Sequence, residues 1–286
     1  MKTASALAAA LVLAAGPAFS DDATDRLNKA LEALSAQAGY VLTADWKLDL
    51  EKVKDPVKGH VESLVRHKED FLRLHAKFED GEVTIYKKGA QIAGQNLETK
   101  EWGPVSDDPR AKFVLKMFNM REFLTEAAGM ATKTRLSKGD REESLRVEFD
   151  TDPEKLKKLL SDADAGKALI TGGTLDNATM KVAIEVDRKS GIPQSLSIEI
   201  EGDSTHLPRK KPSDGKDEGW EPWDGEKEAE PGKKPEPKPE PKPEPKPEEI
   251  QTPVTERVKL RIDATPDYKK SLDAEVPEAV KKVLGL

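Results

Sequence analysis

The chain contains no cysteine. This absence excludes disulfide bonds, thiolate metal sites and cysteine nucleophiles. It also excludes the lipid-modified cysteine that tethers a bacterial lipoprotein to its membrane, so we expect the mature protein to be soluble rather than tethered. An exported chain without disulfides suits a bacterial periplasm better than a eukaryotic secretory route.

An excess of positive charge and long apolar runs are also missing. The sequence has 54 acidic and 47 basic residues, which gives a net charge of −7. Nucleic acids and anionic membrane surfaces bind basic faces of proteins, so we expect no nucleic-acid partner. No stretch after the N-terminal segment approaches the roughly 20 apolar residues that a membrane-spanning helix needs.

The start of the chain has the pattern of a targeting segment. Lys2 supplies a positive charge, residues 7–15 form a short apolar run, and the small residues Ala18 and Ser20 occupy the positions that signal peptidase reads. The pattern predicts a signal peptide over residues 1–20 and export to the periplasm or beyond. A retained N-terminal anchor is the alternative.

Apolar and polar residues alternate in about ten short segments, which is the pattern of strands with one buried and one wet face. In residues 255–263, for example, Val258, Leu260 and Ile262 alternate with charged residues. A single strand is not stable alone, so this last segment must pair with strands formed earlier in the chain. We therefore predict one antiparallel sheet, with strands near residues 42–50, 59–66, 72–78, 83–85, 91–94, 130–137, 143–150, 178–188, 194–201 and 255–263.

Three segments have the spacing of amphipathic helices, namely residues 24–37, 109–128 and 152–163. In the last of these, Asp152 is suited to cap the helix and Pro153 to occupy its first turn. Pro277 begins a short C-terminal helix, which we expect to pack on the end of the sheet. The fold class is therefore predicted to be α+β.

Residues 206–251 differ in kind from the rest of the chain. Their centre repeats a Pro-Glu-Pro-Lys unit, and proline at every second position excludes helices and sheet ladders and favours extended polyproline II. We predict a disordered, charged insertion that interrupts one domain, which is made of residues 21–205 and 252–286. The insertion is interpreted as a solvated spacer. The alternative is a rod that spans part of an envelope layer or binds an envelope component.

No pattern of catalytic or metal-binding residues stands out, so we expect no enzyme activity, no metal and no cofactor. The histidines share no metal-ligand spacing, and His60 and His75 lie on the polar side of their predicted strands. Gly172-Gly173 precedes a strand rather than a helix, which is typical of a turn and not of a phosphate-binding loop. Serines lack the context of a nucleophile elbow.

The order of these parts resembles the LolA/LolB-type lipoprotein carriers and the related LppX/LprG-type lipid-binding proteins. The resemblance rests on an exported chain, an N-terminal helix and a set of segments along the sequence: Gly39–Ala44, the hairpin Asp70–Tyr86, the helical insertion 109–128, the phrase Val186–Pro193, and the ending Val258–Asp263 with Glu275–Ala279. The charged proline insertion and the missing lipoprotein cysteine depart from the family.

The resemblance implies an unclosed half-barrel, a curved antiparallel sheet whose concave face is covered by helices, with acyl chains held between sheet and helices. On this hypothesis the protein carries or senses a lipid, an acyl chain or a lipid-modified protein. The residues expected to contact the ligand are Trp46, Leu74, Phe118, Met120 and Phe123. Methionine and phenylalanine at helical spacing are more often part of a filled core than of a ligand site. This pattern favours the alternative of an envelope scaffold protein with a packed sheet domain and a polyproline spacer. The sequence leaves the oligomeric state open, including a dimer that exchanges its last strand.

Overall fold

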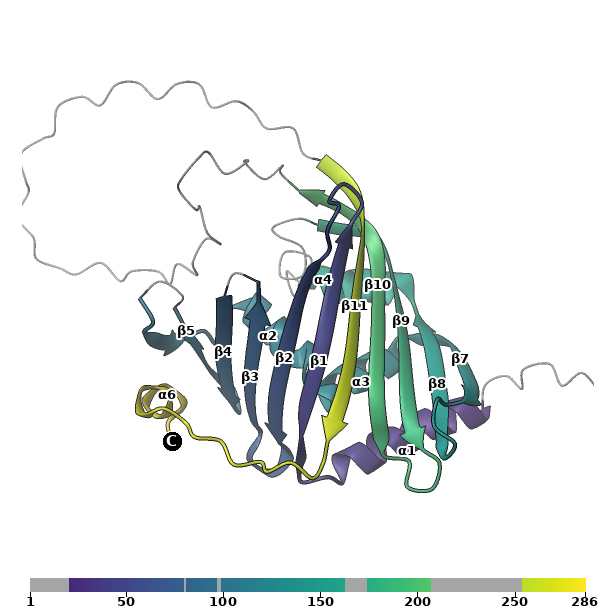
Figure 1. Cartoon of the computed structure of the whole chain (residues 1–286), viewed down its shortest axis with the longest axis horizontal. Coiled ribbons are helices and arrows are strands. Elements are labelled where there is room, and N and C mark those ends of the chain that lie inside the picture. Colours follow the sequence, from purple (N-terminus) through teal and green to yellow (C-terminus); the bar gives the residue numbers. More distant parts are fainter. Residues whose placement is uncertain (1–20, 80, 97–98, 163–173, 207–253) are drawn as a thin grey trace, which may run out of the picture.

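The computed structural model of the protein describes residues 21–79, 81–96, 99–162, 174–206 and 254–286. The proposed signal peptide and nearly all of the predicted insertion lie outside these residues. In the described part, eleven strands form a single antiparallel sheet that is curved and does not close on itself (Figure 1). The strands are β1 (Gly39–Leu50), β2 (Val57–Arg66), β3 (Phe71–Phe78), β4 (Gly81–Lys88), β5 (Gln91–Gln95), β6 (Trp102–Pro104), β7 (Ala131–Lys138), β8 (Ser144–Thr151), β9 (Thr174–Asp187), β10 (Pro193–His206) and β11 (Val254–Asp267).

The last strand occupies the middle of the sheet. The strand order is β6-β5-β4-β3-β2-β1-β11-β10-β9-β8-β7, so β11 joins the strands from the first third of the chain to those from its middle. Trp46 of β1 lies opposite Ile262, and Ile198 of β10 lies opposite the same residue from the other side. The prediction that the segment after the insertion pairs with the earlier strands is confirmed, and the pairing occurs within one chain.

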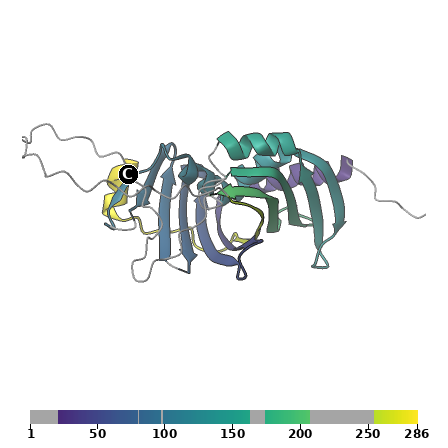
Figure 2. The same cartoon turned by 90° about the horizontal axis from the view of Figure 1, so that it is seen from above.

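Four helices cover one face of the sheet, which we call the inner face (Figure 2). They are α1 (Asp21–Ser35), α2 (Pro109–Met117), α3 (Met120–Gly129) and α4 (Pro153–Asp162). Their apolar side chains form one continuous cluster with the inward-facing residues of the strands. The three predicted helical segments are therefore confirmed, with the middle one divided at Phe118-Asn119. The predicted α+β half-barrel with helices on its concave face is also confirmed.

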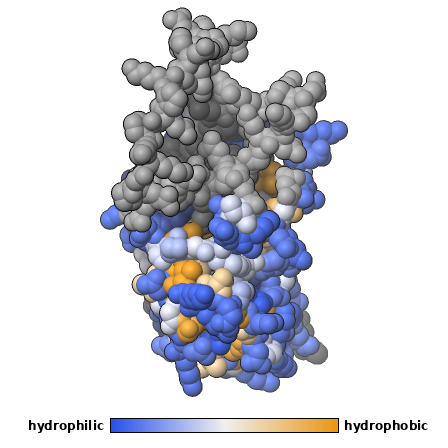
Figure 3. Space-filling view, turned by 90° about the vertical axis from the view of Figure 1, so that its left-hand side faces the viewer, coloured by the Kyte–Doolittle hydropathy of each residue, from blue (hydrophilic) through white to orange (hydrophobic). Residues whose placement is uncertain are grey.

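The C-terminal helix packs on the opposite, outer face. Helix α6 (Glu278–Leu284) buries Val280 and Leu284 in a second apolar cluster with outward-facing residues of β1 to β5, among them Val41 and Phe71. Figure 3 views the molecule from the edge of the sheet near β5 and α6 and shows a small apolar patch surrounded by hydrophilic residues. Helix α6 lies over β4, β5 and β6 at one end of the sheet, as expected, and it packs there on the outer face.

Several boundaries differ from those predicted. β10 continues through His206, which was assigned to the insertion, and β11 continues to Asp267 rather than ending at residue 263. The three-residue strand β6 was missed, because a segment this short has no measurable period. Ser190 and Lys189 donate backbone hydrogen bonds to the Asp187 carboxylate at 2.7 and 3.0 Å, which closes the predicted turn between β9 and β10.

Candidate functional site: the apolar layer beneath α2 and α3

The five predicted ligand contacts lie in one apolar layer between the helices and the inner face. Leu74 and Met120 are fully buried, Phe123 is 3% exposed, and Phe118 is 8% exposed. Trp46 is partly buried and packs against the edge of the same cluster. The structure therefore brings together residues from β1, β3 and the α2–α3 pair that are far apart in the sequence.

Helices α2 and α3 together form a separate cover over this layer, which we call the roof (residues 109–129). Pro109 begins α2, a position where its fixed φ angle suits the helix. Asn119 then caps α3, because its side-chain oxygen accepts a hydrogen bond from the backbone nitrogen of Glu122 at 3.4 Å. The break at residues 118–119 lets both helices turn their apolar sides to the sheet, where the roof buries Ala111, Phe113, Leu115, Met117, Phe118, Met120, Phe123, Leu124 and Ala127.

Polar contacts tie the roof to the strands at the junction between the two helices. The Ser63 hydroxyl of β2 donates to the backbone oxygen of Phe118 at 2.8 Å, and the Tyr40 hydroxyl of β1 donates to Asn119 Oδ1 at 3.3 Å. Ser63, Tyr40 and Asn119 are all buried. Lys87 of β4 also forms an ion pair with Glu122 of α3 at 3.3 Å. The roof is thus anchored at its middle, while its two helices rest on apolar contacts.

The surroundings of the anchor disfavour charge on the sheet side. Burial raises the pKa of the Tyr40 hydroxyl, so this group stays a neutral donor. Burial lowers the pKa of His67, whose ring packs edge-on against Tyr40 with 5.5 Å between ring centroids. The positive charge of Arg121, in the first turn of α3, acts in the same direction on His67. Arg121 therefore lies within electrostatic reach of the anchor.

Two surface hollows lie outside this apolar layer. One, of about 460 Å3, lies between α1, α2 and α3 and is lined by Ser35, Lys116, Arg121, Glu122, Thr125 and Glu126. The other, of about 340 Å3, lies at the ends of β1 and β11 and is lined by Asp49, Leu50, Glu51, Arg257, Val258 and Lys259. The five predicted ligand contacts line neither hollow. Four of them belong to the apolar cluster between the helices and the sheet, and Trp46 packs against that cluster.

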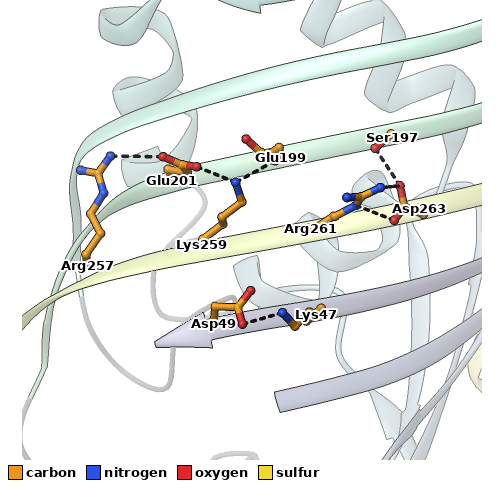
Figure 4. A network of polar contacts seen from close by, with 9 residues as sticks. All are labelled: Lys47, Asp49, Ser197, Glu199, Glu201, Arg257, Lys259, Arg261 and Asp263. Carbon is orange, nitrogen blue, oxygen red and sulfur yellow. Dashed lines mark hydrogen bonds and ion pairs between the residues drawn. The ribbon is translucent and has the colours of Figure 1, made fainter. Parts of the chain in front are cut away.

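The outer face of the central strands carries charge instead of apolar side chains, and Figure 4 shows how these charges are arranged. Lys259 of β11 lies 2.9 Å from Glu199 and 2.8 Å from Glu201, both of β10. Arg257 contacts Glu201 at 3.4 Å. The hydrogen bond from Lys259 lowers the pKa of Glu201, so the pair stays ionised. Such mutual neutralisation across strands is typical of a solvated, stabilising surface.

Histidines and acidic residues form no metal site in the described part of the chain, where no group of three or more His, Asp or Glu side chains is placed to hold a metal ion. His60 accompanies Asp45 at 2.8 Å on the exposed face of β1 and β2. His75 lies beside Thr84 at 2.9 Å on the same face of β3 and β4. Both histidines therefore lie on the polar side, as predicted.

The anchor residues Tyr40, Ser63 and Asn119 were not predicted from the sequence. A signal was present for two of them. Ser63 is a polar residue at an inward position between Val61 and Val65, and such a position in an apolar row requires a partner. Asn119 precedes an apolar helical segment, which is the usual place of a helix cap. No local pattern pointed to Tyr40, because its partner lies 79 residues away.

Comparison with known proteins gives structural matches alone. No protein-family model and no curated protein matches the sequence. The chain is similar to the crystal structure of the lipoprotein LppX from Mycobacterium tuberculosis, with 9% identity and a TM-score of 0.44 over 89% of this chain and 100% of the other. It is also similar to LprF from Mycobacterium bovis, with 9% identity and a TM-score of 0.43 over 93% and 100%. A LolA superfamily protein from Nitrosomonas europaea matches at 8% identity and a TM-score of 0.31 over 90% and 95%.

The open antiparallel sheet with helices across its inner face is the architecture that the sequence resemblance implied. At these identities the likeness concerns the fold and does not identify a ligand. No helix in the described residues is long and apolar enough to cross a membrane.

Proposed function

We propose that the protein is an exported, non-catalytic carrier or sensor that takes up a lipid, an acyl chain or a lipid-modified protein beneath the roof. The observation that carries this proposal is the construction of the roof. Its two helices present a nearly continuous apolar surface to the sheet, and its polar contacts to the strands gather around residues 118–122. Each helix can therefore separate from the sheet without breaking a ladder of hydrogen bonds.

Contacts between the roof and the sheet can be replaced by contacts with a ligand at little cost in free energy. Apolar burial is worth about 25 cal/mol per Å2, whether the buried surface meets a side chain or an acyl chain. A lipid that enters beneath the roof thus replaces contacts that Phe118, Met120 and Phe123 make in the packed state. Methionine adapts to irregular shapes because its side chain is unbranched and has several rotatable bonds.

The packed interior also favours a second candidate. Leu74 and Met120 are fully buried, which is what a rigid, filled domain requires. In that case the protein is an envelope scaffold, and the insertion sets its reach or binds an envelope component. The two candidates differ in what purified protein carries and in what the insertion does.

Native mass spectrometry of the full chain, purified from its own host, tests the carrier proposal directly. A co-purifying acyl species that exchanges with a fluorescent fatty acid is the expected result. Met120→Ala enlarges the layer beneath the roof and is expected to change the affinity for the fluorescent fatty acid severalfold. Met180→Ala is the matched control, since Met180 of β9 is equally apolar and 2% exposed but is not among the predicted contacts.

Removal of residues 208–250 separates the two candidates. A carrier keeps its affinity for the fatty acid after this deletion, because the ligand-binding layer is built from other residues. A scaffold loses its envelope partner. An absence of any acyl species, with equal and negligible fatty-acid binding by the parent chain and both methionine variants, contradicts the carrier proposal.

A further inference from the structure

The hollow between α1, α2 and α3 contains one charge that the fold leaves uncompensated. Four of its lining residues are charged, and three of these are held in ion pairs: Lys116 with Glu126 at 2.8 Å, and Glu122 with Lys87 at 3.3 Å. The fourth is Arg121. Its guanidinium group has neither a hydrogen-bond nor an ion-pair partner among the described residues.

The position of Arg121 is unfavourable for stability in three ways. It lies in the first turn of α3, where the helix dipole disfavours a positive charge. Its side chain is half-buried, so part of its hydration is lost. It also lies near the anchor, where its charge opposes protonation of His67. A residue with a purely structural role would not be expected to combine these costs without a partner.

We propose that Arg121 binds the anionic group, a phosphate or carboxylate, of an acidic lipid whose acyl chains enter beneath the roof. A guanidinium group matches such an oxyanion with two parallel hydrogen bonds. The hollow has a volume of about 460 Å3, which leaves room for a headgroup. The Ser35 and Thr125 hydroxyls on its wall donate to backbone oxygens of their own helices, and each keeps lone pairs that can accept from a polyol headgroup.

The geometry connects this hollow with the apolar layer. Leu124 follows Arg121 by three residues, so the two side chains are neighbours on the surface of α3, and Leu124 is fully buried in the apolar cluster beneath the roof. An oxyanion on Arg121 therefore leaves the acyl chains of the same molecule at the edge of the roof, beside Leu124. This inference rests on the proposed carrier function, and it adds that the carried lipid is acidic.

The outer face provides a contrast within the same molecule. There Lys259, Arg257 and Arg261 each contact a carboxylate of a neighbouring position, so the charges of these three cations are compensated (Figure 4). The hollow differs because its single unpaired cation is half-buried. A partly desolvated charge attracts an oxyanion more strongly than a fully hydrated one.

The test compares the full chain with Arg121→Gln, using three probes in calorimetric titrations: dioctanoyl phosphatidylglycerol, the uncharged dioctanoylglycerol and inorganic phosphate. We expect Arg121→Gln to weaken phosphatidylglycerol binding by about tenfold or more, the range of a charge-assisted hydrogen bond, and to leave dioctanoylglycerol binding unchanged. Lys112→Gln is the control, because it removes the same charge from an exposed site on α2.

A second readout separates recognition from stability. Arg121→Gln is expected to keep or raise the melting temperature, since it removes a cation from the first turn of α3. A lowered melting temperature with equal losses for both lipids overturns the inference in favour of a structural role. Unchanged phosphatidylglycerol binding, with dioctanoylglycerol still bound, overturns it while the carrier proposal stands.

The remaining outcomes concern the source of the anion. If neither lipid binds the parent chain, the carrier proposal fails. In that case, if the parent chain binds phosphate and Arg121→Gln does not, Arg121 is a site for a free oxyanion. If the parent chain does not bind phosphate either, the proposed site is overturned altogether. Equal effects of Lys112→Gln and Arg121→Gln indicate an effect of total charge and also overturn it.

Discussion

At the scale of single residues, the decisive feature is the hydroxyl group of Ser63, which lies in a row of apolar side chains on the inward side of β2. Ser63 lies between Val61 and Val65 on the inward side of β2, and its hydroxyl satisfies the backbone oxygen of Phe118 at the middle of the roof. A backbone carbonyl buried without a partner costs about 1–3 kcal/mol. One hydrogen bond of ordinary length therefore helps to set where α2 ends and how the roof is held.

Ser63→Ala is expected to lower the free energy of unfolding by about 1–3 kcal/mol, because the Phe118 oxygen then loses its partner inside the protein. If the roof opens to admit a ligand, the same change should also speed the release of a bound fatty acid. Urea unfolding and stopped-flow fluorescence measure the two effects.

Ser197→Ala is the matched control for this change. Ser197 also lies on a strand and donates at 2.7 Å, but to the exposed Asp263 carboxylate on the outer face. Water replaces that partner, so the control should change stability by less than about 0.5 kcal/mol. Equal effects of the two substitutions would show that the buried hydrogen bond has no special role.

At the scale of elements, the pairing of β1 with β2 depends on a glycine that makes room for an indole ring. Trp46 lies opposite Gly59 in the ladder, and a Cβ atom built on Gly59 would come within 2.4 Å of the Trp46 ring. The Trp46 ring also packs edge-on against the ring of Phe78 on β3, with 5.9 Å between the two ring centroids. The indole thus covers the bare backbone of β2 and closes one edge of the apolar layer.

Gly59→Ala is therefore expected to displace the Trp46 ring and to destabilise the protein by about 1–3 kcal/mol, the usual range for overpacking. Gly81→Ala is the control, since Gly81 begins β4 and a Cβ atom there meets nothing within 4 Å. Thermal unfolding followed by circular dichroism compares the two. Equal stability of both variants would mean that the indole position is not constrained by Gly59.

The strands also show which parts of the fold the sequence patterns can predict. β1, β9 and β11 were predicted because their inward residues are apolar and their outward residues are charged, a contrast that period two reveals. In β2 and β3 the pairs Leu64-Val65 and Phe71-Leu72 break the alternation, because α6 and the segment before it cover the outer face there. Consecutive apolar residues indicate that a strand is buried on both faces of the sheet. They do not indicate which element covers the second face.

The candidate site was predictable in part for a similar reason. Phe118, Met120 and Phe123 could be assigned to the apolar layer because they share a helical face with other apolar residues. The anchor and the unpaired Arg121 could not be found this way. Their importance depends on contacts between α3 and strands that lie far away in the sequence, and on the absence of a partner for one cation in the described structure, which no local pattern encodes.

At the scale of the whole molecule, the sheet is held together by its last strand. β11 pairs with β1 on one side and β10 on the other, so without it the strands β6 to β1 and β10 to β7 are two separate sheets. β10 and β11 are neighbours, and His206 and Val254 lie opposite each other at the point where the chain leaves the sheet. β10 and β11 are thus an antiparallel pair of strands that are consecutive in the described part of the chain.

This arrangement predicts that a two-residue Asn-Gly turn can replace residues 207–253. The pair His206–Val254 already has the geometry of a hairpin end, and Asn-Gly favours the turn type that matches strand twist. Shortening the loop lowers the entropy cost of closure, so the free energy of unfolding should rise by about 2–3 kcal/mol. A Gly/Ser linker of the natural length is the control and should match the parent chain.

Guanidinium unfolding measures the stability change, and sedimentation velocity measures the mass. A monomer is expected for the parent chain and for both variants, because β11 reaches its place between β1 and β10 of its own chain. A parent chain that sediments as a dimer and becomes a monomer only with the short turn would show instead that the long insertion lets β11 cross into a second molecule. The two halves of the sheet would then belong to different chains, and the roof of each would cover a layer completed by its partner.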